Sequence, residues 1–265
     1  MYSKSRLLFK WLQYYFPASN GRGHGVHSPF VYELIREVLN DRKYYSAYKQ
    51  IETLKNDLLK DKRSIQVNDF GAGAGMRGTS LKRVSYIARH EVSTRKFGRL
   101  LFRLANFYSV KTIVEMGSSL GISTAYLAAA NTASSIHTME GSSGIAEIAK
   151  ENFQKLGMSN ISIFTGQFES GLTDLIVSNP PADLVFIDGN HRKKPVLEYF
   201  EKLLDNISPA ALIIIHDIHW SREMEEAWAI IQADPRVKMS IDIFSAGLVF
   251  FRDEFKVKQQ FVIRF

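Results

Sequence analysis

From Lys111 onward, short runs of β-branched residues alternate with amphipathic stretches, and this alternation constrains the fold more than any other feature of the sequence. Such a pattern is typical of a parallel sheet whose strands are connected by helices. The predicted strands are Thr112–Met116, Ile136–Glu140, Ile161–Thr165, Leu184–Asp188, Leu212–Asp217, Val237–Phe244 and Leu248–Arg252. The last two are joined by residues 245–247 alone, which is too short for a crossover. We therefore expect an α/β fold with a seven-stranded, mostly parallel sheet, a final antiparallel hairpin and helices on both faces.

Residues 1–93 are predicted to be a basic, mainly helical extension in front of a domain that spans residues 94–265. Residues 1–110 have a net charge of +12, whereas residues 111–265 have a net charge of −5. Ser28 followed by Pro29 is typical of a helix start. Residues 1–16 predict an amphipathic helix that packs on its own domain, with an anionic membrane or a second copy of the chain as alternative contacts.

The composition excludes several classes of protein. The chain has 265 residues and no cysteine, which removes disulfides, thiolate metal sites and thiol nucleophiles. No stretch approaches the ~18 uncharged apolar residues of a membrane-spanning helix. Residues 1–16 also lack the small-residue cleavage site of a signal peptide. We therefore expect a globular, cytoplasmic protein.

A turn that contains two glycines follows the first predicted strand, in the sequence Val114-Glu115-Met116-Gly117-Ser118-Ser119-Leu120-Gly121. Gly117 allows a sharp turn close to a ligand, and Gly121 allows the next helix to pack closely. The second strand ends in Glu140, 23 positions after Gly117, where an acid that binds a ribose is expected. The turn lacks the Gly-x-Gly-x-x-Gly spacing that holds a pyrophosphate, and Glu115 would repel a phosphate and favour a cationic amino group.

These motifs resemble the class I S-adenosylmethionine-dependent methyltransferases. The resemblance lies in the Glu-x-Gly-x-x-x-Gly turn, in the later acid Glu140, and in Gly166-Gln167-Phe168 after the third strand. Within that class, Val114–Gly117 and Phe186–Gly189 are similar to the small-molecule O-methyltransferases related to catechol O-methyltransferase. The resemblance covers residues 94–252 and implies a Rossmann-like fold, S-adenosylmethionine as cofactor, and methyl transfer to a hydroxyl of a small-molecule acceptor.

The resemblance also implies which residues contact the cofactor. They are Glu115, Gly117, Ser119, Gly121, Glu140, Gly141, Gly166, Gln167, Phe168 and Asp188. Glu140 would accept hydrogen bonds from the ribose hydroxyls. Asp188 would lie beside the sulfonium, where its negative charge favours the bound cation.

Methyl transfer to oxygen also needs a group that takes the acceptor's proton. His191 stands three residues after Asp188, where the catechol-type enzymes have a lysine base. The resemblance therefore implies that His191 and Asp188 are the catalytic residues. The alternative is that His191 is a loop histidine bonded to the backbone.

A divalent cation such as magnesium is a further implication of the resemblance. Metal-dependent relatives hold it with the fourth-strand acid and an Asp-Asn pair after the fifth strand. Here Asp188 and Asp217 are present, but Ile218 stands where the asparagine would be. Two carboxylates need water and substrate to complete such a site. His216 and His219 are alternative ligands for a softer ion.

Three other segments are interpreted without a cofactor role. Asn179-Pro180-Pro181 precedes the fourth strand and predicts a turn. Residues 69–75 are rich in glycine, but no acid-ended strand follows them, and they are interpreted as a flexible flap. Residues 21–25 are interpreted as a linker, with a substrate or metal loop as the alternative.

Two alternative functions stay open at this point. The +12 charge of residues 1–110 would suit an RNA methyltransferase, although no nucleic-acid-binding motif accompanies it. A cofactor-binding or interaction protein without catalysis is the other alternative, because the asparagine is missing and the base is uncertain. The oligomeric state, including a homodimer, is not predicted.

Overall fold

The computed structural model describes residues 1–19, 21–23, 25–68 and 79–265. The chain forms two compact units. The first, here called the central unit, is Arg42–Pro180, and the second, here called the split unit, is Met1–Asp41 together with Pro181–Phe265. The predicted boundary between residues 93 and 94 falls inside the central unit, so it does not separate these units; as a division of function it stays a prediction.

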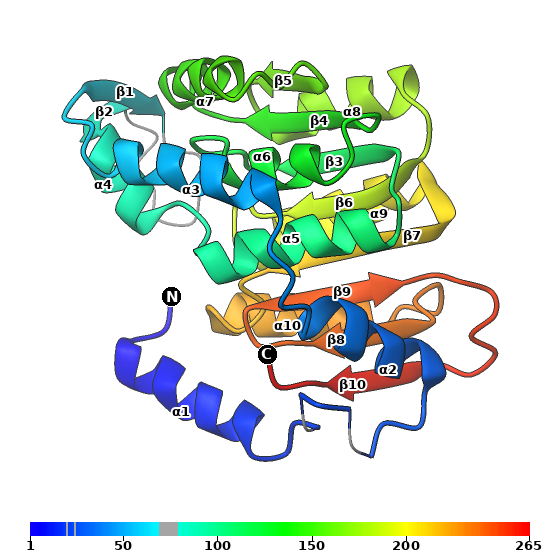
Figure 1. The fold of residues 1–265 in the computed structure, drawn as a ribbon. Helices are drawn as coiled ribbons and strands as arrows, with labels where there is room; N and C mark the ends of the chain where they lie inside the picture. The colour runs from blue at the N-terminus through cyan, green and yellow to red at the C-terminus, as the bar shows by residue number, and fades with distance from the viewer. Residues whose placement is uncertain (20, 24, 69–78) are drawn as a thin grey trace. The chain divides into compact units, whose positions relative to one another are not determined.

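The central unit contains three parallel strands of the predicted sheet. Its elements are α3 (Ser46–Leu58), β1 (Ser64–Asn68), β2 (Thr79–Arg83), α4 (Val84–His90), α5 (Arg95–Phe107), β3 (Thr112–Met116), α6 (Ile122–Ala130), β4 (Ser135–Glu140), α7 (Ser143–Lys155), β5 (Ile161–Thr165) and α8 (Phe168–Ser178) (Figure 1). The order is β3-β4-β5, with Met116 opposite Met139 and Glu140 opposite Thr165. The carboxyl ends of all three strands therefore lie at one edge, where α/β sheets bind ligands.

Strands β3 and β4 of the central unit are covered on both faces. All five residues of β3 are buried, as expected for a parallel strand between two helical layers. Helices α6 and α8 both contact β4, with α6 in front of the strand in Figure 1 and α8 behind it. This arrangement confirms the predicted α/β class.

Helices α3 and α4 share an apolar core with α6 and α7. Tyr48 and Ile51 of α3 and Ile87 of α4 pack with Tyr126 of α6 and Ile148 of α7. These side chains are almost completely buried, so the cluster is a strong contribution to stability. Part of the predicted N-terminal extension is therefore built into the core of the central unit.

The split unit contains the remaining strands. Its elements are α1 (Lys4–Tyr15), α2 (Pro29–Leu34), a π-helical turn η1 (Ile35–Leu39), β6 (Ala182–Ile187), α9 (Lys193–Leu204), β7 (Ile207–His216), α10 (Arg222–Ala233), β8 (Met239–Asp242), β9 (Ala246–Phe250) and β10 (Gln259–Val262). Within this unit the strand order is β10-β8-β9-β7-β6. Strands β8 and β9 form the predicted antiparallel hairpin, and β6 runs parallel to β7. Within the described ranges, no helix has both the length and the apolar composition needed to cross a membrane.

All seven predicted strands are present, and the structure adds three that were not predicted. Strand β10 pairs in parallel with β8, so strands β3 to β10 give eight strands where seven were predicted. Strands β1 and β2 form an antiparallel pair that was not predicted from the sequence, within residues 1–93. The flap predicted for residues 69–75 lies outside the described residues. The segment 21–25 lies partly outside them.

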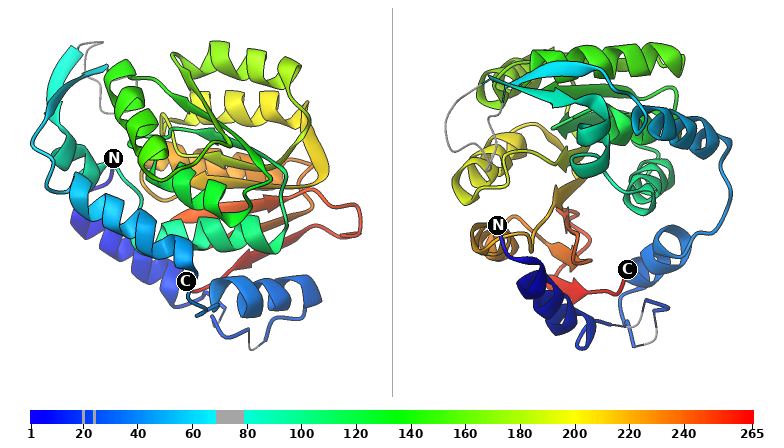
Figure 2. Two further views of the ribbon diagram at one scale, coloured as in Figure 1. Left: turned by 45° about the horizontal axis from the view of Figure 1, so that its top comes forward. Right: turned by 90° about the vertical axis from the view of Figure 1, so that its left-hand side faces the viewer.

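Helix α1 packs on its own unit, as preferred from the sequence. The Tyr14 side chain is buried, and its hydroxyl donates a hydrogen bond to the carbonyl of Ile263. Lys10 Nζ lies 2.9 Å from a carboxylate oxygen of Glu225. Arg264 Nε donates to the carbonyl of Tyr15 at 2.8 Å, and both views in Figure 2 show the helix beside the C-terminal end of the chain.

Gly121 gives a test of how tightly this fold is packed around its turn. Its φ is 81°, and a Cβ there would lie 2.5 Å from Cε1 of Phe153. We expect Gly121→Ala to lower the free energy of unfolding by roughly 2–4 kcal/mol, from left-handed strain and overpacking together. Urea unfolding followed by circular dichroism measures this change.

Gly157→Ala is the matched control for that substitution. Gly157 also has a positive φ, 66°, but nothing lies within 4 Å of its Cβ position. It should therefore cost only about 1 kcal/mol, from backbone strain alone. Equal losses for the two variants would show that Phe153 does not restrict the turn.

Candidate active site

The turn after β3 is held by residues with a left-handed backbone. Gly117, Ser119 and Gly121 have φ angles of 103°, 46° and 81°. The amides of Gly117 and Ser118 both donate to the carbonyl of Met139, at 2.9 and 3.0 Å, which ties the turn to β4. Gly121 then stands at the N-cap of α6. The predicted cofactor turn is therefore a constrained loop at the carboxyl end of β3.

Glu140, the last residue of β4, connects two loops through its two carboxylate oxygens. Oε2 accepts a hydrogen bond from the amide of Ser119 at 2.9 Å, and Oε1 accepts one from the amide of Ser142 at 2.9 Å. Burial raises the pKa of Glu140, while these backbone hydrogen bonds oppose the rise. Each carboxylate oxygen can accept a further hydrogen bond, which suits the hydroxyl groups of a ligand.

Glu115 is completely buried within β3. Its Oε2 accepts a hydrogen bond from Thr138 Oγ1 of β4 at 2.7 Å and another from the hydroxyl of Thr124 in α6. The carboxylate therefore connects β3, β4 and α6 at the base of the turn. Its predicted contact with the methionine part of a cofactor stays a prediction.

Two hydroxyl groups in the turn fit a polar ligand. Ser118 Oγ and Ser119 Oγ are buried and have no hydrogen-bond partner within the described part of the chain. Buried polar atoms in proteins almost always have a partner, so these hydroxyls are suited to a bound polar molecule. Sequence reasoning included Ser119 but missed Ser118, although Ser118 lies inside the same motif. The residues of this turn therefore fit the predicted cofactor.

The end of β5 lies next to Glu140. The amide of Gly166 donates to the Glu140 carbonyl at 3.0 Å, and Gly166 has a φ of 147°. Gln167 is the N-cap of α8, and Phe168 is the first residue of that helix. Gly141 directly follows Glu140. All predicted cofactor residues except Asp188 therefore belong to the central unit and lie at or near the carboxyl ends of β3, β4 and β5.

A second group of predicted residues lies in the split unit, after β6 and β7. Asp188 Oδ1 is 2.7 Å from Nδ1 of His216 and 3.7 Å from Nε2 of His191. Asp217 Oδ1 is 3.8 Å from Nδ1 of His216. The structure thus brings the two predicted catalytic residues, Asp188 and His191, together. It also places His216 between the two carboxylates, a role that sequence reasoning missed.

His216 is the cation of this group. Burial by itself lowers its pKa, but the charges of Asp188 and Asp217 and the hydrogen bond to Asp188 outweigh that effect and raise the pKa to about 9. At neutral pH His216 is therefore protonated and donates to Asp188. One imidazolium between two carboxylates leaves the group with a net negative charge.

The loops that hold these side chains are strained. Asn190, His191 and Asp217 have positive φ angles of 68°, 40° and 57°. Asn190 is fixed by a hydrogen bond from its Nδ2 to the hydroxyl of Tyr199 at 3.1 Å. Non-glycine residues in this conformation cost about 1–3 kcal/mol each and concentrate at functional sites. The strain therefore marks the ends of β6 and β7 as a candidate site.

The predicted divalent cation on Asp188 and Asp217 stays a prediction. Across the described residues, no group of three or more His, Asp or Glu side chains is arranged to hold a metal ion. In this structure the positive charge between the two carboxylates is supplied by His216. As they stand, these residues do not fit a metal.

His219 serves a different purpose from His216. Its Nε2 is 2.7 Å from Asp242 Oδ2, and its Nδ1 is 3.2 Å from Glu225 Oε1. Its ring also stacks on Phe244, with centroids 5.2 Å apart. Both ring nitrogens are thus engaged in fixing the loop after β7, so the alternative in which His216 and His219 share a softer metal ion gains no support.

Comparison with known proteins gives a family match over the middle of the chain. Residues 114–218 match a family described as a methyltransferase domain. A catechol O-methyltransferase from Niastella koreensis is 32% identical over 124 residues, which is 46% of this chain and 55% of the relative. The chain thus spans about half the length of this curated relative.

Solved structures show the same fold. An O-methyltransferase from Bacillus cereus in complex with SAH has a TM-score of 0.56 and 18% identity, over 78% of this chain and 91% of that chain. A SAH-bound methyltransferase from Podospora anserina has a TM-score of 0.60 and 17% identity, over 85% and 97%. An O-methyltransferase from Streptomyces achromogenes in complex with SAM has a TM-score of 0.57 and 17% identity, over 79% and 91%. At these identities the likeness is one of fold.

His216 should titrate with a pKa of about 9, well above the ordinary value of 6.5. A raised pKa in the folded state means that the ion pair stabilises the fold fully below pH 6.5 and loses that effect as the pH rises through 9. Proton NMR of the histidine rings between pH 5 and pH 10 measures the titration, with His216→Gln to assign the signal.

Asp188→Asn removes the nearest carboxylate charge and should lower the pKa of His216 by at least about one unit. Ile218 stands beside these residues in the sequence but carries no charge, so Ile218→Val serves as the control and should leave the pKa unchanged. A His216 signal that titrates near 6.5 in the unmodified protein would contradict the assignment of His216 as the cation.

Proposed function

We propose that this protein transfers a methyl group from S-adenosylmethionine to a hydroxyl of a small molecule. The premise is that residues 114–218 match a methyltransferase domain and that the chain has the fold of the class I S-adenosylmethionine-dependent methyltransferases. The fold alone does not determine a reaction, so the proposal depends on the residues at the strand ends. The central unit would bind the cofactor.

The arrangement around Glu140 is the observation that carries the proposal. Its carboxylate ends β4 and holds the Ser119 amide of the turn and the Ser142 amide of the next loop. Each of the two oxygens can accept one more hydrogen bond, which suits the paired hydroxyls of a ribose. The buried hydroxyls of Ser118 and Ser119 add further polar groups in the same turn.

Glu140→Ala should weaken binding of S-adenosylhomocysteine by about 10–100-fold, because hydrogen bonds to a charged group contribute about 1.5–3 kcal/mol. Isothermal titration calorimetry measures the affinity. Glu140→Gln keeps the shape of the side chain and separates the loss of charge from a loosened turn.

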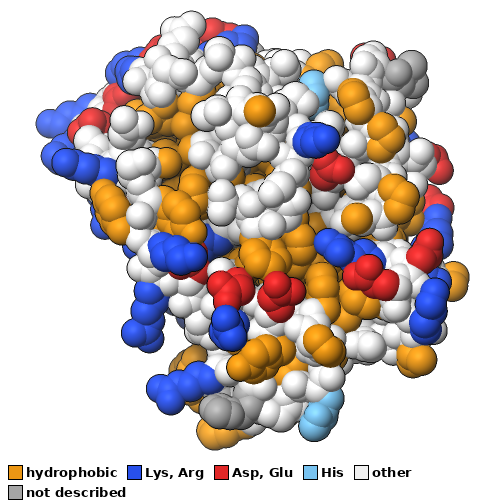
Figure 3. All heavy atoms as spheres, turned by 45° about the vertical axis from the view of Figure 1, so that its right-hand side comes forward, with side chains coloured by type: hydrophobic (Ala, Val, Ile, Leu, Met, Phe, Trp, Pro, Cys, Tyr) orange, Lys and Arg blue, Asp and Glu red, His pale blue; other side chains and the backbone are white. Residues whose placement is uncertain are grey.

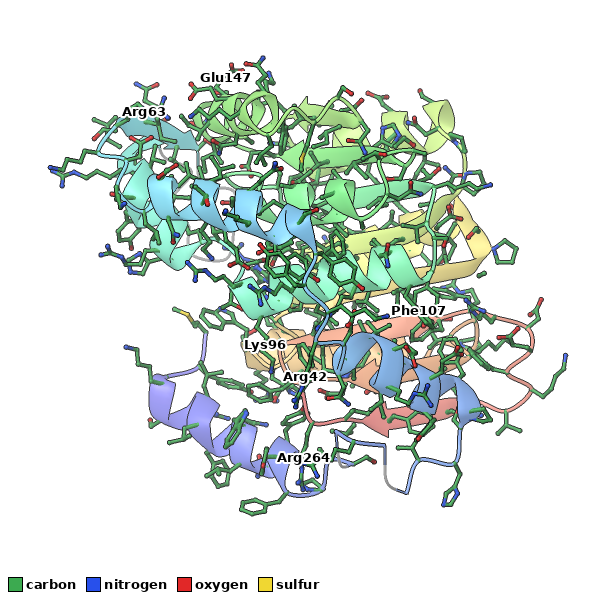
Figure 4. The ribbon with its side chains drawn as sticks, viewed as in Figure 1. Arg42, Arg63, Lys96, Phe107, Glu147 and Arg264 are labelled. Carbon is green, nitrogen blue, oxygen red and sulfur yellow. The ribbon has the colours of Figure 1, made fainter. Side chains whose placement is uncertain are left out.

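Glu147→Ala is the matched control. Glu147 lies on α7 of the same unit, points outward in Figure 4 and has a 66% exposed side chain. Its substitution should leave the affinity unchanged. An unchanged affinity in Glu140→Ala would show that the ribose role is wrong.

The acceptor chemistry is proposed for the group around Asp188. When bound, S-adenosylmethionine supplies an electrophilic methyl group on a positively charged sulfonium. Methylation of the acceptor oxygen would release the acceptor's proton, which a residue of this chain would have to accept. His191 would accept that proton, with Asp188 3.7 Å from its Nε2 to stabilise the resulting imidazolium. His216 would hold Asp188 in place through the 2.7 Å hydrogen bond.

A catechol is the first acceptor to test, because the curated relative from Niastella koreensis is named as a catechol O-methyltransferase. His191→Ala should lower kcat by about 10²–10⁴-fold, the usual contribution of a general base. It should leave the affinity for S-adenosylhomocysteine unchanged. Full turnover by His191→Ala would remove the base assignment.

The control for this assay is Lys194→Ala, which changes an 85% exposed side chain close to His191 in the sequence. Activity should be measured with a chelator and with added magnesium, because turnover that survives chelation would remove the predicted metal. A protein that binds S-adenosylhomocysteine but methylates no hydroxyl in a broad panel would support the non-catalytic alternative.

RNA as the acceptor stays a prediction from the charge of residues 1–110. On the face shown in Figure 3, Lys and Arg side chains are interrupted by Asp and Glu side chains and form no continuous stripe. A nucleic-acid backbone binds best to an uninterrupted basic surface. The small-molecule acceptor is the preferred proposal, because the curated relative is named as a catechol O-methyltransferase.

A further inference from the structure

Helix α1 has one face that holds it to the split unit. Tyr14 is buried, its hydroxyl donates to the Ile263 carbonyl, and its ring lies 5.2 Å from that of Phe244. Lys10 Nζ and the Tyr2 hydroxyl both bind Glu225, at 2.9 and 2.7 Å. Polar and apolar contacts on this face are thus sufficient to fix the helix.

The opposite face of α1 exposes a continuous apolar surface. Leu8, Phe9 and Phe16 are 59%, 58% and 73% exposed. We call the whole set the α1 patch, which consists of Leu8, Phe9, Trp11, Leu12, Tyr15 and Phe16. Contiguous exposed apolar surface of this kind marks an interaction site, because water-facing surfaces normally avoid it.

The rings within the patch are ordered rather than loosely arranged. Trp11 and Tyr15 stack with centroids 4.8 Å apart, and the Arg264 guanidinium lies over Tyr15 at 4.4 Å. Figure 4 shows Arg264 beside the C-terminal end of the helix. Trp and Tyr rings with adjacent cations are typical of surfaces that lie in the headgroup layer of a bilayer.

The charged residues of α1 and of the segments that flank it in the sequence have a single sign. Residues 1–32 contain Lys4, Arg6, Lys10 and Arg22 but no Asp or Glu. Lys4 and Arg6 are exposed on α1 itself, and the Arg6 guanidinium lies 4.4 Å from the centre of the Tyr2 ring. A partner that covers the patch therefore meets positive charge and should itself be anionic.

We propose that α1 docks the protein on an anionic lipid surface, with the α1 patch inserted between the headgroups and with Lys4 and Arg6 against the lipid phosphates. A second copy of the chain fits less well. In a symmetric contact the same patch faces itself, so both sides of the interface would carry Lys4 and Arg6, and residues 1–32 would offer no acidic partner to them. An anionic lipid surface would bury the apolar side chains of the patch and would also attract the positive charges of Lys4 and Arg6.

The test uses the full chain and lipid vesicles of two compositions. Vesicles of phosphatidylcholine with about 30% phosphatidylserine should bind the protein at least about 10-fold more tightly than vesicles of phosphatidylcholine alone, and added salt should weaken this binding. Co-sedimentation measures the bound fraction. The fluorescence of Trp11 should shift to shorter wavelength on binding, and Trp11→Phe should remove that shift.

Two substitutions identify the surface that binds. Phe9→Ser with Phe16→Ser should reduce binding at least about 10-fold, because the two most exposed aromatic rings of the patch are lost. Lys4→Glu with Arg6→Glu should abolish the preference for anionic vesicles. Both variants should keep the affinity of the unmodified protein for S-adenosylhomocysteine or, if it binds none, its thermal unfolding midpoint, which shows that they fold.

The matched control changes two exposed apolar side chains elsewhere in the split unit. Ile230 and Val257 are 47% and 72% exposed, and Ile230→Ser with Val257→Ser should bind vesicles as the unmodified protein does. The proposal is overturned if the unmodified protein does not bind anionic vesicles, if it binds neutral vesicles equally well, or if Phe9→Ser with Phe16→Ser still binds. A dimer in sedimentation velocity that those two substitutions abolish, without vesicle binding, would assign the patch to a second copy.

Discussion

The hydrogen bonds that Ser119 and Ser142 donate to the Glu140 carboxylate are the interaction on which the candidate cofactor site depends. Parallel pairing of β3, β4 and β5 brings their carboxyl ends to one edge but leaves the loops beyond that edge undefined. Glu140 defines them, because its two oxygens bind amides from two different loops. Its own carbonyl accepts from the Gly166 amide, which adds the third loop. One residue thus fixes the geometry of three strand ends.

The group in the split unit depends on a charge rather than on backbone amides. Asp188 and Asp217 both lie within 4 Å of His216 Nδ1, and without a positive charge two carboxylates in such proximity repel each other. The imidazolium removes most of that repulsion and orients Asp188. The positive φ angles of His191 and Asp217 show that the backbone is strained to present these side chains. Electrostatic attraction within the group is the force that compensates for this strain.

The features that the sequence predicted are those that depend on local patterns. The alternation of strands and helices and the turn from Gly117 to Gly121 can be found from neighbouring residues alone, and the structure confirms both. Strand β10 was missed because Gln259 and Gln260 give it a half-polar pattern, and its pairing with β8 is long-range. The partnership of His216 with Asp188 joins residues 28 positions apart, so no spacing motif reveals it. The partners that bind α1 also lie more than 200 positions away, which is why its docked and exposed faces could not be distinguished from the sequence.

Helix α1, through Tyr2 just before it, and Asp217 are both bonded to Trp220, in the loop after β7 of the split unit. The amide of Tyr2 donates to the Trp220 carbonyl at 3.0 Å, and the amide of Trp220 donates to the Asp217 carbonyl at 2.9 Å. Glu225 Oε2 accepts hydrogen bonds from the Tyr2 hydroxyl and from Lys10 Nζ, and Glu225 Oε1 lies 3.2 Å from His219 Nδ1. Two backbone hydrogen bonds therefore connect α1 to Asp217, whose carboxylate lies 3.8 Å from His216 Nδ1. Because packed polar networks of this kind have few alternative arrangements, the position of α1 and the geometry around Asp217 constrain each other.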